Sequence, residues 1–307
     1  FTQDSGLPLS LKNFIGYYHL DPRSIYGKFS FSRLCADAGV LDDFIEPAES
    51  ILTKAFSKLV AVDSRRWIKF LTDILPRFSC ELAASLSDFE KRMLQMFYIT
   101  VFQEAADWRS HTTQANMQLL ADSPIMMHEL YELLSLNLEC IDFIDQPVSL
   151  GFDCPLDLHC TYTRDQILIA MDYMTPKNVR EGVKWLPDKQ VDVFFITLNK
   201  ADKDYSPTTM YNDYSINESL FHWQSQSKTS DTASTGQRYI NHRQRGSKVV
   251  LFVREFKQDS IGAAPYTCLG TAAYVKHTGS KPMNITWHLD QPIPAKYLRK
   301  TNKLVVG

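Results

Sequence analysis

The sequence lacks the features that would place it among membrane, secreted or disordered proteins. No apolar run approaches the roughly 18 residues that a membrane-spanning helix needs, and no secretory signal pattern opens the chain. Hydrophobic residues make up 44% of the 307 residues and charged residues 22%, which excludes a disordered composition. We therefore expect two globular domains and no membrane partner.

Local signatures of catalysis are missing as well. Residues 9–145 contain no glycine-rich phosphate loop, no His-Glu metal pair and no nucleophile elbow. The serines, histidines and aspartates of the chain match no local triad signature. The sequence begins at Phe1 rather than at a methionine and enters an amphipathic pattern at once, so we expect a piece of a longer protein.

The six cysteines are scattered, mostly among apolar residues, which is typical of reduced thiols in a cytoplasm. One group, Cys140, Cys154, His159 and Cys160, could in principle surround a zinc ion. However, adjacent His159 and Cys160 is a poor ligand spacing, and the chain has no C-x2-C knuckle. We expect ordinary linker residues here, and no metal.

The formal net charge of −2 hides a split between the two halves. Residues 161–307 contain 20 Lys and Arg against 13 Asp and Glu, a net charge of +7, and the remainder carries −9. Such asymmetry indicates two domains with different partners, and it makes the basic half the candidate for binding a polyanion.

Helical spacing of apolar residues dominates residues 9–145. In SLKNFIGYYHL it places Leu11, Phe14 and Ile15 on one face, and DPRSIYGKFSFSRLCADAGV reads as a second helix that ends at Gly39. The aromatic and Met side chains of later segments lie at core spacing: Trp67, Met93, Met96, Phe97, Met126 and Met127. We expect residues 1–150 to form a helical adaptor domain.

The period then changes to that of strands. After a proline-containing linker at 146–160, Thr163 and Gln166 form a capping box that predicts a short helix. Strands are expected at 191–199, 218–226, 247–256, 266–275 and 283–289. The prediction is thus an α+β chain in which residues 151–307 form a compact barrel or curled sheet, with the long loops 200–217 and 227–246 available for binding.

The segment Ser206 to Ser230, SPTTMYNDYSINESLFHWQSQSKTS, mixes rings with hydrogen-bonding groups. Alternation along its strand puts Phe221 and Trp223 on one face and His222 and Gln224 on the other. One interpretation makes the rings core and the polar groups a solvated face. The other is a pocket in which ring faces hold a planar nucleobase. The proposed base-binding residues are Asn199, Tyr211, Asp213, Tyr214, Phe221, Trp223 and Gln224, with Asp213 accepting from the cytosine amino group.

A second feature is the cationic stretch STGQRYINHRQRGSKV, which with LNKADKDYS could form two rims of a groove. Either it is a solvated loop or it contacts phosphates, in which case binding should weaken with salt. The predicted phosphate-binding residues are Lys200, Lys203, Arg238, His242, Arg243, Arg245 and Lys248.

The sequence also offers a candidate nuclease site. Glu255 and Lys257 in VREFK resemble the second half of a metal-dependent nuclease motif, with Asp188 as the first half. The two carboxylates must share one Mg²⁺, yet 67 positions and at least one strand separate them. An exposed charge pair at the end of a strand is the favoured interpretation.

Three long stretches resemble a known C-terminal region: VDVFFITLNKADKDYSPTTMYNDYSINESLFHWQSQS, TGQRYINHRQRGSKVVLFVREFK and GTAAYVKHTGSKPMNITWHL. The region belongs to SauUSI-like type IV restriction enzymes, which join a phospholipase-D-type nuclease to a helicase motor. SLKNFIGYYHLDPRSIYGKFSFSRLCADAGV is similar to the segment that follows the motor.

The resemblance implies a prokaryotic cytoplasmic protein that recognises double-stranded DNA carrying 5-methylcytosine or 5-hydroxymethylcytosine. It implies an SRA/PUA-like curled β-barrel that flips the modified base into an aromatic pocket. The helicase and nuclease domains of the same parent chain would be the partners. Catalysis, ATP and divalent metal are expected only in those missing parts, so we expect no enzyme activity and no cofactor here. Alternatives are a protein-interaction module that docks a helicase-nuclease, or a Mg²⁺-dependent nuclease domain.

Overall fold

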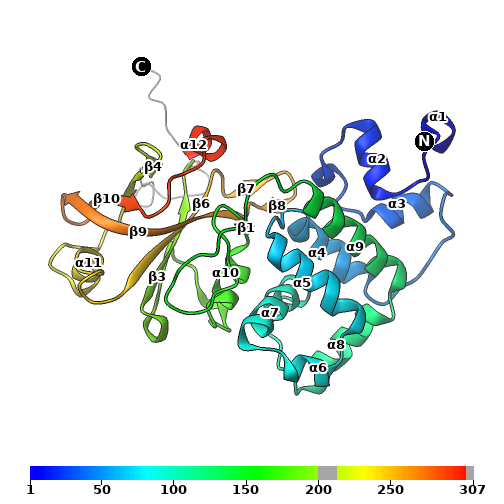
Figure 1. The fold of residues 1–307 in the computed structure, drawn as a ribbon, viewed down its shortest axis with the longest axis horizontal. Helices are drawn as coiled ribbons and strands as arrows, with labels where there is room; N and C mark the ends of the chain where they lie inside the picture. Colours follow the sequence, from blue (N-terminus) through cyan, green and yellow to red (C-terminus); the bar gives the residue numbers. More distant parts are fainter. Residues whose placement is uncertain (200–212, 302–307) are drawn as a thin grey trace. The chain divides into compact units, whose positions relative to one another are not determined.

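A computed structural model describes residues 1–199 and 213–301 (Figure 1). The predicted site residues Lys200, Lys203 and Tyr211 lie outside the described residues. The chain divides into two compact units, which we call the helical unit and the sheet unit. The helical unit consists of Phe1–Asp145, Thr161–Pro176 and Ser260–Gly262, and the sheet unit of Gln146–Cys160, Lys177–Asp259 and Ala263–Gly307. This division differs from a boundary at residue 150, because 146–150 join the sheet unit and 161–176 the helical unit.

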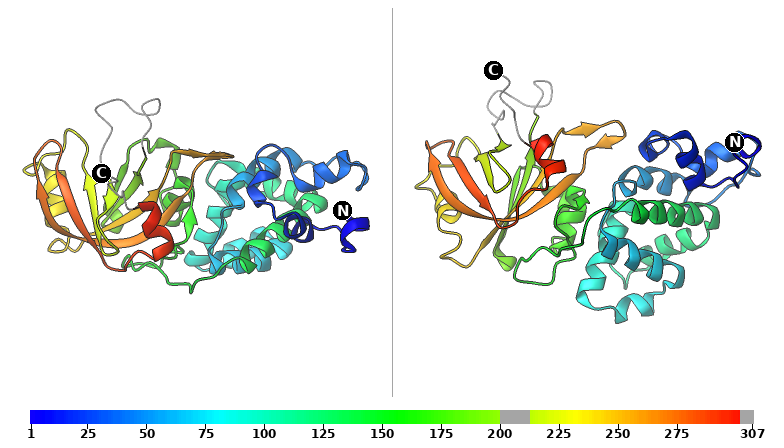
Figure 2. Two further views of the ribbon diagram at one scale, coloured as in Figure 1. Left: turned by 90° about the horizontal axis from the view of Figure 1, so that it is seen from above. Right: turned by 45° about the horizontal axis from the view of Figure 1, so that its top comes forward.

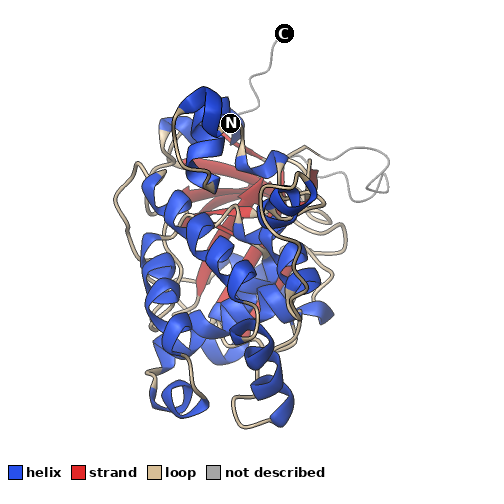
Figure 3. Cartoon of the chain, turned by 90° about the vertical axis from the view of Figure 1, so that its right-hand side faces the viewer, coloured by secondary structure: helices blue, strands red, loops and turns tan. Residues whose placement is uncertain are grey.

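The first part of the chain is helical, as its periodicity predicts (Figure 3). The helix expected over DPRSIYGKFSFSRLCADAGV is corrected, because only Phe31–Asp37 is α-helical there and Pro22–Ser24 forms a short 3₁₀ helix. Its α-helices are α1 (Thr2–Ser5), α2 (Leu11–Tyr18), α3 (Phe31–Asp37), α4 (Glu49–Leu59), α5 (Arg65–Ile74), α6 (Cys80–Ser85), α7 (Asp88–Phe102), α8 (His111–Ala121) and α9 (Pro124–Glu139). Short 3₁₀ helices are η1 (Pro22–Ser24) and η2 (Leu75–Arg77). Among the described residues, no helix has both the length and the apolar content to cross a membrane.

Serine fixes where many of these helices begin. A serine hydroxyl at the N-cap accepts a hydrogen bond from a first-turn backbone N–H, which has no partner within the helix. The caps are Ser10, Ser30, Ser64, Ser79, Ser87 and Ser110. At Ser87 the Glu90 carboxylate also accepts from the serine N–H, which completes a capping box.

The core of the helical unit lies around α7. The predicted core side chains Trp67, Met93 and Phe97 are buried, and the Trp67 indole N–H donates to the Met93 carbonyl at 3.0 Å. Burial of each large side chain stabilises the unit by about 1.5–3 kcal/mol. The capped helix predicted after the linker is α10 (Arg164–Ala170), and it packs on α7, where Gln166 Nε2 donates to Thr100 Oγ1 at 2.9 Å. The sequence analysis assigned 161–176 to the domain of strands, so it did not predict that α10 packs on α7.

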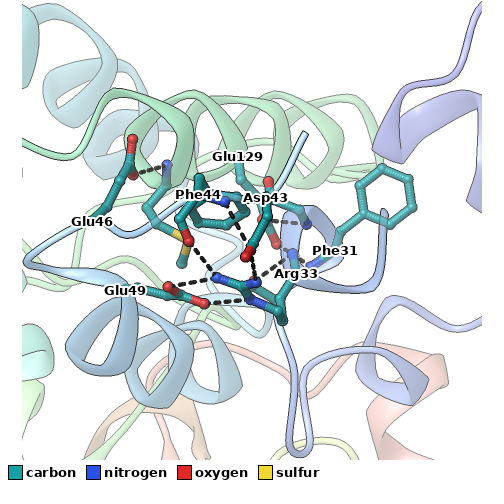
Figure 4. A network of polar contacts seen from close by, with 10 residues as sticks. Phe31, Arg33, Asp43, Phe44, Glu46, Glu49 and Glu129 are labelled. Atoms are coloured by element: carbon teal, nitrogen blue, oxygen red, sulfur yellow. Dashed lines mark hydrogen bonds and ion pairs between the residues drawn. The ribbon is translucent and has the colours of Figure 1, made fainter. Parts of the chain in front are cut away.

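Carboxylates brace the N-termini of α3 and α9 in the helical unit (Figure 4). Buried Glu129 accepts from the backbone N–H groups of Phe31 at 2.6 Å and of Ser32 at 2.8 Å, at the start of α3. Glu46 does the same for Ile125 and Met126 at the start of α9. At both positions the carboxyl oxygens accept from first-turn N–H groups that have no partner within the helix, and an acidic group there also interacts favourably with the helix dipole when it is ionised.

The sheet unit contains one mixed sheet, drawn red in Figure 3, in the order β2-β3-β6-β9-β10-β5-β4. Its strands are β2 (Val183–Leu186), β3 (Val191–Thr197), β4 (Tyr214–Ser215), β5 (Leu220–Gln224), β6 (Lys248–Arg254), β9 (Tyr266–Thr278) and β10 (Asn284–Leu289). Only β3 and β6 pair in parallel within this order. The chain's remaining short strands are β1 (Thr161–Tyr162), β7 (Gln258–Asp259) and β8 (Gly262–Ala263). The 3₁₀ helices η3 (Pro176–Asn178) and η4 (Pro187–Lys189) flank β2.

All five predicted strands are present, but the predicted barrel is wrong in one respect. Among the described residues, the end strands β2 and β4 do not pair with each other, so the sheet is open. It still curls. The ring centroids of Phe194 on β3 and Trp223 on β5 lie 4.3 Å apart, although three strands separate β3 from β5 in the sheet order. The α+β class is confirmed, with a helical region followed by a mixed sheet.

Strand β9 carries two register shifts, a feature that bends a strand locally, and the orange part of the ribbon is curved (Figure 2). One lies opposite Leu251/Phe252 beside Gly270, which has φ +83°, a backbone conformation that glycine adopts without steric cost. A Cβ at Gly270 would also approach Leu158 Cδ2 to 2.4 Å. The other shift lies opposite Thr286/Trp287.

Helices α11 (Ser234–Ile240) and α12 (Ala295–Thr301) contribute Tyr239, Tyr297 and Leu298 to the core on the inner face of the sheet. The sequence analysis missed both helices. In α11 the sequence STGQRYI has little apolar periodicity, and Gly236 sits where a Cβ would meet the Ser230 carbonyl oxygen at 2.0 Å. Close packing, rather than helix propensity, therefore determines this element.

Candidate nucleic-acid interface

The alternation predicted for 219–226 is present on β5, and it separates the proposed pocket residues. Phe221 and Trp223 face the core and are 0% and 5% exposed, whereas His222 and Gln224 between them are partly exposed. Phe221 and Trp223 therefore cannot hold a base between their ring faces in this structure. For these two rings the structure corrects the pocket hypothesis, and the core interpretation holds.

Asp213 also has a structural role. It is 2% exposed, and its Oδ1 accepts from the Gln224 backbone N–H at 2.9 Å, which ties the start of β4 to the end of β5. The carboxylate is thus turned toward the chain itself rather than toward a cytosine amino group. Asn199 is exposed after β3, where its N–H donates to the Glu255 carbonyl at 2.8 Å, and three strands lie between β3 and β5 in the sheet order.

Tyr214 is the described tyrosine of the predicted pocket, and it lies on the outer face of the sheet. Antiparallel register places it opposite His222, and their rings are nearly parallel, with centroids 4.8 Å apart and planes at 14°. Residues opposite each other on antiparallel strands share a face. The same register places Thr286 of β10 opposite His222 and Lys276 of β9 opposite Thr286.

We call this set of four side chains on β4, β5, β10 and β9 the outer row. Tyr214, His222 and Thr286 are partly exposed and Lys276 is exposed. A parallel line of polar groups runs beside it, because Asn284 lies opposite both Gln224 and Thr278. The outer face thus presents ring surfaces, amides, hydroxyls and a cation together, which is a composition that can stack on and hydrogen-bond to a nucleobase.

Some of the predicted phosphate-binding residues are bound to other residues of the fold, and others are exposed. Arg238 forms a two-pronged ion pair with Asp192, whose side chain is 0% exposed, and its guanidinium also lies 4.4 Å from the Trp185 ring centroid. His242 is 3% exposed, and its Nε2 accepts from the Tyr274 N–H at 3.1 Å while burial lowers its pKa. Both residues are part of the fold, so their assignment to phosphate binding is corrected.

The other predicted cations lie nearer to solvent. Arg243 pairs with Asp290 at 3.1 Å, Lys248 Nζ donates to the Ser149 carbonyl at 2.8 Å, and Arg245 is exposed. Sequence reasoning missed three exposed lysines around the β9–β10 turn, namely Lys228, Lys276 and Lys281. The Lys281 N–H donates to the Thr229 carbonyl at 3.1 Å, so the turn and the segment after β5 are adjacent. These lysines are isolated in the sequence, so no charge cluster marks them. The polar face beside them could have been predicted from the alternation of Asn284, Thr286 and His288 along β10.

The fold does not support the nuclease arrangement. Asp188 precedes β3, Glu255 follows β6, and β3 and β6 run parallel from Val191↔Lys248 to Thr197↔Arg254. The two carboxylates therefore lie beyond opposite ends of a seven-residue strand pair, about 23 Å long or more, and cannot share one ion.

The described residues also offer no cluster of three or more His, Cys, Asp or Glu side chains suited to a metal ion. In the candidate zinc-binding group of the sequence analysis, Cys154 and Cys160 are buried and Cys140 is exposed. His159 is partly buried, and its Nε2 is shielded from solvent.

The described chain is an α+β protein whose open, mixed sheet carries a polar and aromatic outer face. Residues 156–300 match the model of a domain of unknown function (DUF3427), a domain found in helicase-associated proteins. The matched range includes the whole outer row and the β9–β10 turn. No curated protein matches the chain.

Proposed function

We propose that the sheet unit is the DNA-binding specificity module of a helicase-associated restriction protein, and that it reads a modified cytosine turned out of the base stack. The observation that carries this proposal is the near-parallel Tyr214–His222 ring pair on the outer face of a sheet in the +7 half of the chain. The match to a domain of helicase-associated proteins and the resemblance to type IV restriction enzymes support the same function.

Magnitudes show what such a surface has to supply. Turning a base out of a duplex costs a few kcal/mol. Stacking on an aromatic side chain contributes about 1–3 kcal/mol per base, so the ring pair can offset most of that cost. Burial of a methyl group adds only about 0.8 kcal/mol, a factor of about four in affinity. Stronger preference for 5-methylcytosine requires a closely shaped slot, in which one methyl group is worth about 1–3 kcal/mol.

For the helical unit we propose a docking role toward the motor and nuclease parts of the same parent protein. Two observations favour it. The remainder of the chain outside 161–307 carries a net charge of −9. Large apolar side chains are also exposed in its first part: Ile45 is 95% exposed, Val40 62% and Phe29 48%. Exposed apolar groups of this kind are typical of protein contacts rather than of DNA contacts.

Titration of the whole chain with labelled DNA tests the proposal. The probes are one duplex with a central cytosine, the same duplex with 5-methylcytosine or 5-hydroxymethylcytosine, and the corresponding single strands. We expect salt-sensitive binding to every probe and tighter binding to the modified ones. Absence of binding at 50 mM salt would leave the docking role as the function of the chain. Cleavage of any probe with added Mg²⁺ would contradict the assignment as a non-enzymatic module.

A further inference from the structure

Thr286 has the shortest side chain of the outer row, and we call the space above it, between its two neighbours, the gap. It lies between His222 on one neighbouring strand and Lys276 on the other, and all three share the outer face. Two inter-strand steps of about 4.8 Å separate the backbones of β5 and β9, or about 9.6 Å. A planar ring with van der Waals contacts of about 3.5–4.0 Å on both sides needs roughly 7–8 Å. The short Thr286 side chain therefore leaves room for one ring between the imidazole and the lysine stem.

A β-bulge adds an apolar wall beside this gap. The register of β9 and β10 passes from Thr286↔Lys276 to Trp287↔Tyr274, so Val275 is the extra residue of β9. Bulges redirect side chains and are common beside functional sites. Val275 is 48% exposed, although it lies in a strand whose preceding residues are mostly buried. The bulge thus leaves an isopropyl group at the surface, next in sequence to Lys276 of the outer row.

Polar groups flank the same gap along β10. Asn284 is two residues before Thr286 and therefore on the same face, and its register partner on β5 is Gln224. An amide offers both a donor and an acceptor, which is what the edge of a pyrimidine requires. Lys276 and, at the adjacent turn, Lys281 provide cations for the flanking phosphates.

We infer that the gap over Thr286 is a base slot that takes one unpaired pyrimidine of DNA. The ring stacks on His222, the polar edge faces Asn284, and the 5-substituent contacts Val275 and the methyl group of Thr286. This inference depends on the proposed DNA-binding function and identifies its specificity-determining residues. The methyl group is read by apolar contact at the bulge, and the lysines add affinity that is independent of the base.

Two conservative variants test the slot: Val275→Ser removes the isopropyl group, and Thr286→Ser removes one methyl group while retaining the hydroxyl. In the titrations described above, we expect each variant to lower the ratio of affinities for methylated over unmodified DNA by three- to fivefold. Each variant should lose more affinity for methylated than for unmodified DNA, because the groups removed contact the 5-substituent. Ile216→Ser is the matched control, because Ile216 is 43% exposed but lies outside the outer row, and it should leave the ratio unchanged.

A filled slot provides the opposite test. Thr286→Trp should abolish the methyl preference, and a urea midpoint equal to that of the wild type would show that the variant folds. Retention of the full methyl preference by both Val275→Ser and Thr286→Ser would overturn the slot while the DNA-binding function stands. A wild-type chain that binds DNA without methyl preference would overturn it as well. A wild-type chain that binds no DNA would contradict the proposed function itself.

Discussion

The guanidinium of Arg238 on α11 donates two hydrogen bonds, of 2.7 and 2.9 Å, to the carboxylate of Asp192 on β3. The Asp192 side chain is 0% exposed and the Arg238 side chain 18% exposed, and the guanidinium lies over the Trp185 ring. An arginine that sequence reasoning assigned to DNA phosphate thus fastens a helix to the sheet. The fork geometry of the guanidinium suits a carboxylate, and lysine cannot reproduce both bonds.

The first prediction concerns this pair. Arg238→Ala should lower the free energy of unfolding by about 3–5 kcal/mol, because it leaves the buried Asp192 charge without a partner. Arg243→Ala, which breaks the exposed pair with Asp290, should cost at most about 1 kcal/mol. Urea denaturation of both variants measures the difference. Equal costs would mean that the Asp192 pair contributes no more than a surface pair.

The second prediction separates two aromatic residues that the sequence analysis grouped together. Tyr214→Ala should weaken DNA binding by about 0.5–1.5 kcal/mol, roughly 2- to 13-fold, because it removes the ring that packs against His222, on which the base stacks. Trp223→Ala should instead lower the free energy of unfolding by about 3–5 kcal/mol, because it empties part of the core. Fluorescence anisotropy and urea denaturation, applied to both variants, give the two readouts. A folded Trp223→Ala chain with wild-type stability would contradict the core assignment.

The third prediction concerns acid. His242 accepts from the Tyr274 N–H through Nε2 and contacts the Ser247 carbonyl through Nδ1, an arrangement that requires the neutral ring. Burial lowers its pKa below the ordinary 6.5, and the nearby charges of Arg243 and Asp290 oppose each other. The folded state therefore binds this proton less readily than the unfolded state, so stability is retained above pH 6.5 and falls as the pH drops below it.

Urea midpoints between pH 8 and pH 5 measure that fall. His242→Gln, whose amide can still accept a hydrogen bond but cannot be protonated, should flatten the pH dependence in this range. A variant with the same slope as the wild type would show that His242 is not the group responsible.

The fourth prediction concerns Glu129 in the helical unit. Burial raises the pKa of its carboxyl group above the ordinary 4.5, against the effect of the hydrogen bonds from Ser32 and Phe31. The native state therefore holds this proton more tightly than the unfolded state, and stability falls as the pH rises through the window above 4.5. Glu129→Gln should remove that fall, and Glu129→Ala should cost about 1–3 kcal/mol for each backbone N–H left unpaired at α3. Urea denaturation of these variants, followed by helical circular dichroism from pH 4 to pH 8, distinguishes these outcomes.

The fifth prediction concerns phosphate contacts. Lys276→Gln and Lys281→Gln should each reduce the slope of log affinity against log salt by about one, with similar losses for methylated and unmodified DNA. Arg238 and His242 contribute no such contact because they are engaged in the fold. Lys248→Gln should leave the salt slope unchanged, since its ammonium group binds the Ser149 carbonyl. A slope reduced by Lys248→Gln and not by Lys276→Gln would restore the interface predicted from the sequence.

Local pattern was enough to predict much of the fold. Most helices of the first part, the Thr163–Gln166 capping box, the five principal strands and the core position of Trp67 and Phe97 follow from short-range periodicity and capping chemistry. The two faces of β5 were also predictable, because a period of two assigns Phe221 and Trp223 together and opposite to His222. These features depend on residues within a few positions of one another.

The partners of individual side chains depended on the tertiary structure. Only the packing of α11 on β3 shows that Arg238 meets Asp192, and only strand order aligns Tyr214, His222, Thr286 and Lys276 across four strands. The parallel pairing of β3 and β6 separates Asp188 from Glu255 for the same reason. Sequence periodicity fixes the face on which a side chain lies, whereas long-range strand pairing and helix packing determine which residues share that face and which charges remain available to a ligand.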